Sequence, residues 1–241
     1  MPRRPRLVTA LKMIPGLRES SHLARAAGHA AANVVHQALT GRTYAAARLE
    51  TIFNDKADPW GFERSDEEQA RFARTWELVP PAGYRRILEI GCAEGHFTDQ
   101  IAVRYPEAEV HAIDLVPLAA DRAAARCAGR SNVRVQCSDI GKEPIDGAFD
   151  LIFCMGVLEY GPAFRELDVI RRSILGALAP GGYLLVETHS APHDLQRRWW
   201  ARHLAWGARA QHDPFRSHLR MIAEAFVCGD ARMTTVLQKQ A

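Results

Sequence analysis

The feature that most constrains the fold is a regular alternation of short apolar segments with helical ones between residues 86 and 188. Strands that alternate with helices form a parallel sheet whose two faces are covered by the helices. The pattern therefore predicts an α/β, Rossmann-like domain. The expected strands are 86–90, 109–114, 133–137, 149–154 and 183–188, with two more near 225–229 and 232–238, and the expected helices between them are 95–105, 117–128 and 164–178.

The flanking segments predict further helices. Residues 21–50 are rich in Ala and Leu, and residues 66–78 follow a capping box formed by Ser65 and Glu68. Residues 53–63 are expected to be a loop, and residues 192–224 read as mostly helical. We therefore divide the 241 residues into a basic helical N-terminal extension (1–50) and one domain (51–241).

The charge of the chain is uneven although its net value is only +3. Before Glu50, eight lysines and arginines face one acid, Glu19. This segment either meets an anionic partner or is a solvated helical extension. No apolar run approaches the roughly 18 residues of a membrane span. The five cysteines include no C-x-x-C pair, so we expect thiols in a reducing cytoplasm and neither disulfides nor a metal site.

A glycine-containing loop follows the first strand in the sequence E-I-G-C-A-E-G (89–95). Gly91 permits a tight turn, and Gly95 allows the helix start to pack near the strand. The exposed amides at the start of the helix can bind a negative or polar group. Two glycines alone fit an ordinary strand–helix turn equally well.

Acidic residues after the next two strands favour a nucleotide-like ligand. The second strand ends at Asp114, 23 residues after Gly91, where a carboxylate can accept both hydroxyls of a ribose. The third strand leads to Ser-Asp-Ile (138–140), where Asp139 can face an adenine amino group and Ile140 can lie against the ring.

Together these segments resemble the class I methyltransferases that depend on S-adenosylmethionine (SAM). The resemblance covers residues 87–187 and includes the E-I-G-x-x-x-G segment, Asp114, the S-D-I segment and L-A-P-G-G-Y-L-L-V-E (178–187), in the family's order. It implies a Rossmann-like domain with a seven-stranded, mostly parallel sheet and helices on both faces. It also implies SAM as the cofactor.

The resemblance assigns roles around the methionine part of SAM. Gly91, Gly95 and the Cys92 backbone would line it, and Glu89 would position the loop or the cofactor amine. Met155, just after the fourth strand, would lie near the sulfonium.

On the nucleoside side, the resemblance gives Asp114 the ribose and places Leu115 beside the adenine, which Asp139 and Ile140 would hold. Ala93 departs from the family, which has glycine there, and its methyl group is tolerable if φ stays negative. A dehydrogenase is the main competing reading, but its G-x-G-x-x-G spacing is missing.

Substrate groups are expected at the carboxyl end of the sheet. Glu159 can bind a substrate amine or accept a proton, and Tyr160 can pack on the substrate; alternatively, Glu159 faces solvent. His189 follows the fifth strand and is a candidate substrate contact, although a surface or hydrogen-bonding histidine fits as well.

Two segments resemble the NodS-like branch of these enzymes, whose named member N-methylates the amino sugar of a nodulation chitooligosaccharide. They are D-P-W-G-F (58–62) and G-x-x-E-G-H-F-T (91–98). This likeness implies that Trp60 and Phe62 form part of a lid over SAM and substrate; they also fit as anchoring core aromatics. We expect N-methylation of a small metabolite or sugar, with O-methylation nearly as well supported.

Two other functions remain open at this point. The basic N-terminus suits an RNA or protein methyltransferase, although the small net charge does not favour nucleic acid. A SAM-binding protein without catalysis would retain the same loop. A pocket wall, a partner or membrane contact, the contact of a homodimer and the apolar core are the alternatives for Trp199, Trp200 and Trp206.

Overall fold

The computed structural model describes residues 44–158, 164–189, 208–227 and 232–241. Residues 48–241 form one compact unit. The N-terminal extension as far as residue 43, the candidate pair Glu159 and Tyr160, and the three tryptophans lie outside the described residues. His189 is the last residue of a strand, and its side chain is also outside them.

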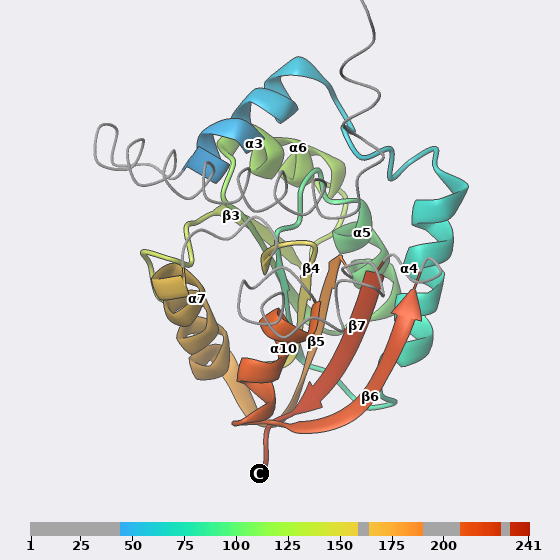
Figure 1. The fold of residues 1–241 in the computed structure, drawn as a ribbon. Helices are drawn as coiled ribbons and strands as arrows, with labels where there is room; N and C mark the ends of the chain where they lie inside the picture. Colours follow the sequence, from blue (N-terminus) through green and yellow to red (C-terminus); the bar gives the residue numbers. More distant parts are fainter. Residues whose placement is uncertain (1–43, 159–163, 190–207, 228–231) are drawn as a thin grey trace, which may run out of the picture. The chain divides into compact units, whose positions relative to one another are not determined.

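A seven-stranded sheet forms the centre of this unit (Figure 1). Its order is β3-β2-β1-β4-β5-β7-β6; β1 to β5 run parallel, and β7 is antiparallel to both neighbours. The predicted mostly parallel sheet is therefore confirmed. The strands are β1 (Arg86–Ile90), β2 (Glu109–Asp114), β3 (Val133–Cys137), β4 (Phe149–Met155), β5 (Leu178–His189), β6 (Arg220–Val227) and β7 (Arg232–Gln238).

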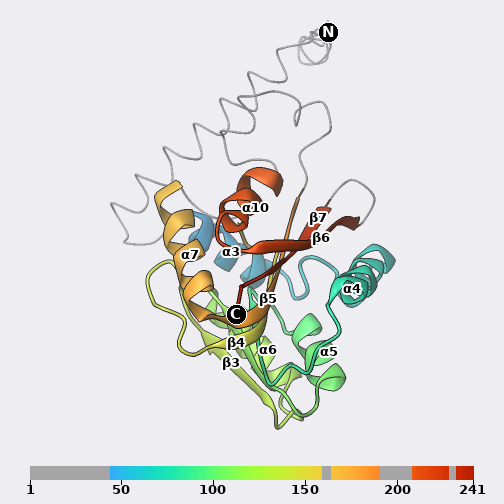
Figure 2. The ribbon, with the colours of Figure 1, turned by 90° about the horizontal axis from the view of Figure 1, so that it is seen from below.

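Helices cover both faces of the sheet, as the alternating pattern predicts (Figure 2). One face carries α4 (Asp66–Leu78), α5 (His96–Arg104) and α6 (Pro117–Arg126), and the other carries α7 (Phe164–Ala177) and α10 (Ala208–Arg216). A further helix, α3 (Tyr44–Asp55), precedes α4. The helix starts follow local chemistry: the Ser65 hydroxyl accepts the Glu68 amide, and Pro117 opens α6. Only this half of the predicted capping box is present, because the Ser65 amide donates to the Gly61 carbonyl and the Glu68 carboxylate accepts Arg71.

Three predicted boundaries are wrong. β6 begins at Arg220, within the stretch predicted as helical, because pairing with β7 overrides the helix propensity of its Ala and Glu residues. β5 begins at Leu178, and the predicted turn is a local irregularity in which Gly181 has φ +77°. The loop predicted for 53–63 starts later, because α3 continues to Asp55.

The sheet register brings the loops after β1, β2, β4 and β5 to one edge. Glu89 of β1 lies opposite Phe153 of β4, and Phe153 lies opposite Leu185 of β5. Two residues further on, Met155 lies opposite Glu187. Ligands of open α/β sheets bind outside this carboxyl edge, so the candidate site is sought there.

Candidate cofactor site

The loop after β1 is held in a single shape by backbone hydrogen bonds. The amides of Gly91 and Cys92 both donate to the Ile113 carbonyl, at 2.8 and 3.1 Å, which fixes the loop to the end of β2. Gly95 has φ +79°, and a Cβ there would lie 3.0 Å from the Cα of Ala123 in α6. The glycine is therefore required by the approach of α6, and not by the strand as the sequence suggested.

Ala93 adopts φ +47°, so the negative φ at which its methyl group would be tolerated without strain is not what the loop has. The left-handed conformation costs a residue with a side chain about 1–2 kcal/mol. The Ala93 amide donates to Asp114 Oδ2 at 2.8 Å, and this charge-assisted bond offsets part of the cost. The loop thus keeps a glycine-like shape without the glycine.

Asp114, the last residue of β2, joins the loop to this strand through its side chain. Its Oδ1 accepts the Val116 amide at 2.9 Å, and the residue is 8% exposed. Burial raises the pKa of this carboxyl, while the backbone amides that it accepts act in the opposite direction. A single hydrogen bond, from the Ala93 amide to the Asp114 carboxylate, therefore joins the loop to the acid that the sequence predicted.

Glu89 is buried beneath the loop. Thr98 of α5 donates its hydroxyl to Glu89 Oε2 at 2.6 Å. Burial, with the nearby Asp114 charge, raises the pKa of Glu89 to about 8, although the Thr98 bond and Arg71 lower it. Glu89 therefore holds a proton over much of the neutral range.

The candidate adenine residues lie after β3. Asp139 Oδ1 accepts the Gly141 amide at 3.0 Å, and its Oδ2 lies 3.0 Å from the Lys142 ammonium. Ile140 is buried in the core that contains α7. Leu115 and Met155 are partly buried at the ends of β2 and β4.

Trp60 and Phe62 are half-buried and pack against the apolar core of the described unit. The Trp60 ring lies 4.9 Å from that of Phe53 and 5.9 Å from that of Phe62, which in turn lies 5.6 Å from Phe72. These contacts fit the anchoring alternative, and the lid over SAM and substrate stays a prediction.

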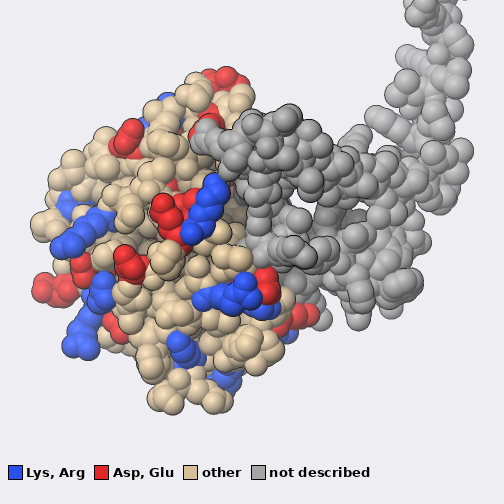
Figure 3. All heavy atoms as spheres, turned by 90° about the vertical axis from the view of Figure 1, so that its left-hand side faces the viewer, with Lys and Arg blue, Asp and Glu red and all other residues tan. Residues whose placement is uncertain are grey.

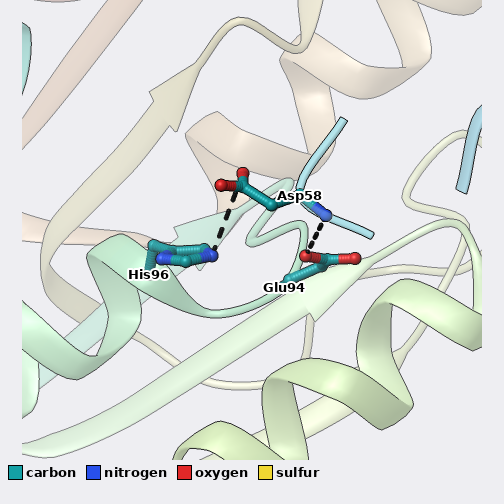
Figure 4. Close-up of side chains that lie close together, drawn as sticks. All are labelled: Asp58, Glu94 and His96. Atoms are coloured by element: carbon teal, nitrogen blue, oxygen red, sulfur yellow. Dashed lines mark hydrogen bonds and ion pairs between the residues drawn. The ribbon is translucent and has the colours of Figure 1, made fainter. Parts of the chain in front are cut away.

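Sequence reasoning missed three side chains that converge beside the loop: Asp58, Glu94 and His96 (Figure 4). Their potential ligand atoms lie within 4.8 Å of one another. However, Arg122 donates to Glu94 Oε1 at 2.7 Å, and Arg126 lies 3.0 Å from His96 Nε2. Arg122 thus pairs with the Glu94 carboxylate, Arg126 lies against the His96 ring, and the Asp58 carboxylate accepts the amides of Phe62 and Glu63. The cluster therefore suits a structural network better than a cation. The sequence signal for this cluster is the acid and the histidine that flank Gly95 in A-E-G-H (93–96).

Comparison with known proteins identifies the family. The family model described as nodulation protein S (NodS) matches residues 49–239. The chain belongs to the NodS family. The resemblance to class I methyltransferases and to their NodS-like branch is thereby confirmed.

The curated relatives include nodulation proteins S and an O-methyltransferase. The chain is 33% identical over 129 residues to nodulation protein S of Rhizobium tropici, covering 53% of each chain. It is 30% identical over 118 residues to the malonyl-[acyl-carrier protein] O-methyltransferase of Halorhodospira halophila, covering 48% of this chain and 39% of the relative. The chain spans about half the length of the curated relatives it matches.

A solved structure of the same family agrees over a longer stretch. The N-methyltransferase NodS from Bradyrhizobium japonicum WM9, in complex with S-adenosyl-L-homocysteine (SAH), superposes with a TM-score of 0.68 at 25% identity. The match covers 82% of this chain and 99% of that one. The fold of the NodS-family member described here is thus the class I methyltransferase fold.

Proposed function

We propose that this protein transfers a methyl group from SAM to an amine of a small metabolite or sugar. One observation carries the proposal: the loop 91–95 is locked to the buried Asp114 at the carboxyl edge of a NodS-family sheet. The SAH bound to the B. japonicum relative supports SAM as the methyl donor.

The residues of this chain would share the binding as follows. The loop 91–95 and Glu89 receive the amino-acid part of SAM, Asp114 accepts the ribose hydroxyls, and the segment 139–140 holds the adenine beside Leu115. Met155 then lies beside the sulfonium. The sulfonium supplies an activated methyl carbon, so the protein has mainly to align the acceptor with it and exclude water.

An amine acceptor is favoured over a hydroxyl because the SAH-bound relative is described as an N-methyltransferase. The O-methyltransferase names among the curated relatives keep the hydroxyl as the second candidate. If the amine arrives protonated, a base is needed, and Glu159 is our candidate, with Tyr160 and His189 as substrate contacts.

A polyanion such as RNA is the alternative to a small-molecule substrate, and the basic residues before Glu50 support it. Figure 3 shows lysines and arginines interspersed with acids on one face of the described residues, so that face has no continuous basic patch of the kind that binds a polyanion. No helix in the described ranges is long and apolar enough to cross a membrane.

A methyl-transfer assay tests this proposal. Radiolabelled SAM is offered with matched acceptors: a chitooligosaccharide with a free terminal amine, its N-acetylated form, and a panel of small amines and hydroxyl compounds. Transfer to amines, with a Glu159→Gln variant that loses turnover more than SAH affinity, supports the proposal. Transfer to hydroxyls alone, or to RNA alone, overturns it, and binding of SAH without any transfer favours the non-catalytic alternative.

A further inference from the structure

Glu94 connects the cofactor loop to a segment that lies more than thirty positions earlier in the chain. The residue is 5% exposed. Its Oε2 accepts the Asp58 amide at 2.7 Å, and its Oε1 accepts Nη1 of Arg122 at 2.7 Å. Both carboxylate oxygens are therefore engaged, one by the segment before α4 and one by α6.

Arg122 and Arg126 fix the same residue from α6. Nη1 of Arg122 also donates to the Phe53 carbonyl in α3 at 3.0 Å, and Nε of Arg126 donates to the Glu94 carbonyl at 2.9 Å. The side chain and the backbone of Glu94 are thus both held by helix α6, and one guanidinium reaches across to α3.

Asp58 gives the segment its shape. It has φ +45°, and its carboxylate accepts the amides of Phe62 at 2.8 Å and Glu63 at 3.0 Å. A non-glycine residue stays in this conformation only where its surroundings determine it. Here the Glu94 carboxylate supplies that determination, because it binds the amide of the strained residue itself.

The loop that presents Glu94 is also the loop that Asp114 holds. The Ala93 amide, one residue before Glu94, donates to Asp114, and Gly95 follows with a left-handed φ. The loop shape that brings Ala93 to Asp114 is therefore the shape that brings Glu94 to Asp58.

We propose that Glu94 is a positioning residue that couples the docking of segment 53–63 to cofactor binding. The coupling rests on the proposed cofactor site, and Glu94 acts without touching the cofactor. Because such coupling is reciprocal, cofactor binding must stabilise the segment as much as the docked segment strengthens cofactor binding. Trp60 and Phe62 would then be positioned by this network.

The test combines calorimetric titration with SAH and hydrogen exchange of residues 53–63. The variant is Glu94→Gln, which removes the charge that Arg122 meets, and the control is Glu63→Gln, an exposed carboxylate in the same segment. In the wild type, SAH should slow exchange within 53–63. In Glu94→Gln, we expect SAH to bind about 5- to 150-fold more weakly and to protect the segment less.

A second variant, Arg122→Gln, should reproduce these effects, and its combination with Glu94→Gln should add little. If Glu94→Gln does not fold, Arg122→Gln alone decides. Wild-type affinity together with wild-type protection in the folded variants overturns the coupling while leaving the cofactor site intact. A general rise in exchange with unchanged SAH affinity also overturns it, because that is the result of a merely structural role. Failure of the wild type to bind SAH would instead remove the proposed function itself.

Discussion

Ala93 carries its side chain at φ +47°, where glycine is the favoured residue. Replacing it with glycine removes a steric cost of about 1–2 kcal/mol from the folded state. Glycine also gives the unfolded chain more conformational entropy, which cancels part of this gain in stability. We therefore expect Ala93→Gly to raise the free energy of unfolding by about 1 kcal/mol, which corresponds to roughly 2–4 °C in melting temperature.

The matched control for this change is Ala124→Gly, at an exposed position of helix α6. The same substitution there should lower stability by about 1 kcal/mol, because glycine is a poor helix former. Chemical denaturation of both variants gives the comparison. A destabilised Ala93→Gly protein would mean that the left-handed φ is not a cost to this loop.

Glu89 provides a second residue-scale prediction. Its pKa is raised to about 8, so it is largely protonated at pH 7 in the absence of the cofactor. If the cofactor ammonium lies near Glu89, its charge lowers this pKa, and SAH binding at pH 7 releases a proton. Calorimetry in buffers of different ionisation enthalpy measures the release. The Glu89→Gln variant should abolish it, and equal enthalpies in all buffers for the wild type would refute the assignment.

At this scale the sequence indicates a residue's role only where a short motif carries it. Asp114 and the glycines of the loop stand at fixed spacing, so their convergence could be predicted from the chain. Asp58 and Glu94 are 36 positions apart, and their bond depends on how segment 53–63 packs, which no local pattern encodes.

At the scale of elements, a buried ion pair joins helix α4 to strand β5. Nη1 of Arg71 donates to Glu187 Oε1 at 2.7 Å, and Nε of Arg71 donates to Glu68 at 2.6 Å. Thr75 of α4 and Thr234 of β7 donate to the other Glu187 oxygen, at 3.4 and 3.3 Å. The Arg71 side chain is 4% exposed and that of Glu187 is 0% exposed.

Removing Arg71 leaves the buried Glu187 carboxylate with Arg232 as its remaining cation, whose Nη1 lies 3.4 Å from Glu187 Oε1. We therefore expect Arg71→Met to cost about 3 kcal/mol of stability, at the lower end of the cost of breaking a buried pair, and the double variant Arg71→Met/Glu187→Met to cost less than the sum of the single ones. Arg74→Met, on the exposed side of the same helix, is the control and should change little. Additive losses measured by urea unfolding would show that the two side chains do not act as a pair.

The elements themselves follow from the sequence to the extent that a periodic pattern identifies them. The five parallel strands were predicted because each is a short apolar run between helices. The start of β6 was missed because R-M-I-A-E-A (220–225) contains good helix formers, and its extended form depends on β7, which follows it in the chain. Tertiary pairing decided this boundary.

At the scale of the whole molecule, His212 links α10 to two strands and makes stability depend on pH. Its ring nitrogens lie 3.1 Å from the Thr188 hydroxyl and 2.8 Å from that of Thr235, and the residue is fully buried. Burial, with the nearby Arg216 charge, lowers the pKa of His212 to about 3.

The sign of the dependence follows from this shift. Between pH 6.5 and about 3 the unfolded state binds the proton and the folded state does not, so stability falls as the pH is lowered. His212 lowers the free energy of unfolding by at most about 1.4 kcal/mol for each pH unit below pH 6.5. Comparing the wild type with His212→Gln between pH 7.5 and 5 isolates the effect from that of the carboxylates. Parallel stability curves for the two proteins would contradict it.

The central claim is that residues 91–95 and Asp114 bind the cofactor, and calorimetric titration with SAH tests it most directly. We predict micromolar binding of SAH, no binding of NAD, and binding to Asp114→Asn at least about 10-fold weaker, since a hydrogen bond to a charged group contributes about 1.5–3 kcal/mol. Asp99→Asn, which changes a half-buried acid on α5 that pairs with Arg130, is the control and should bind as the wild type does. No binding of SAH to the wild type, or equal binding to Asp114→Asn, would contradict the account.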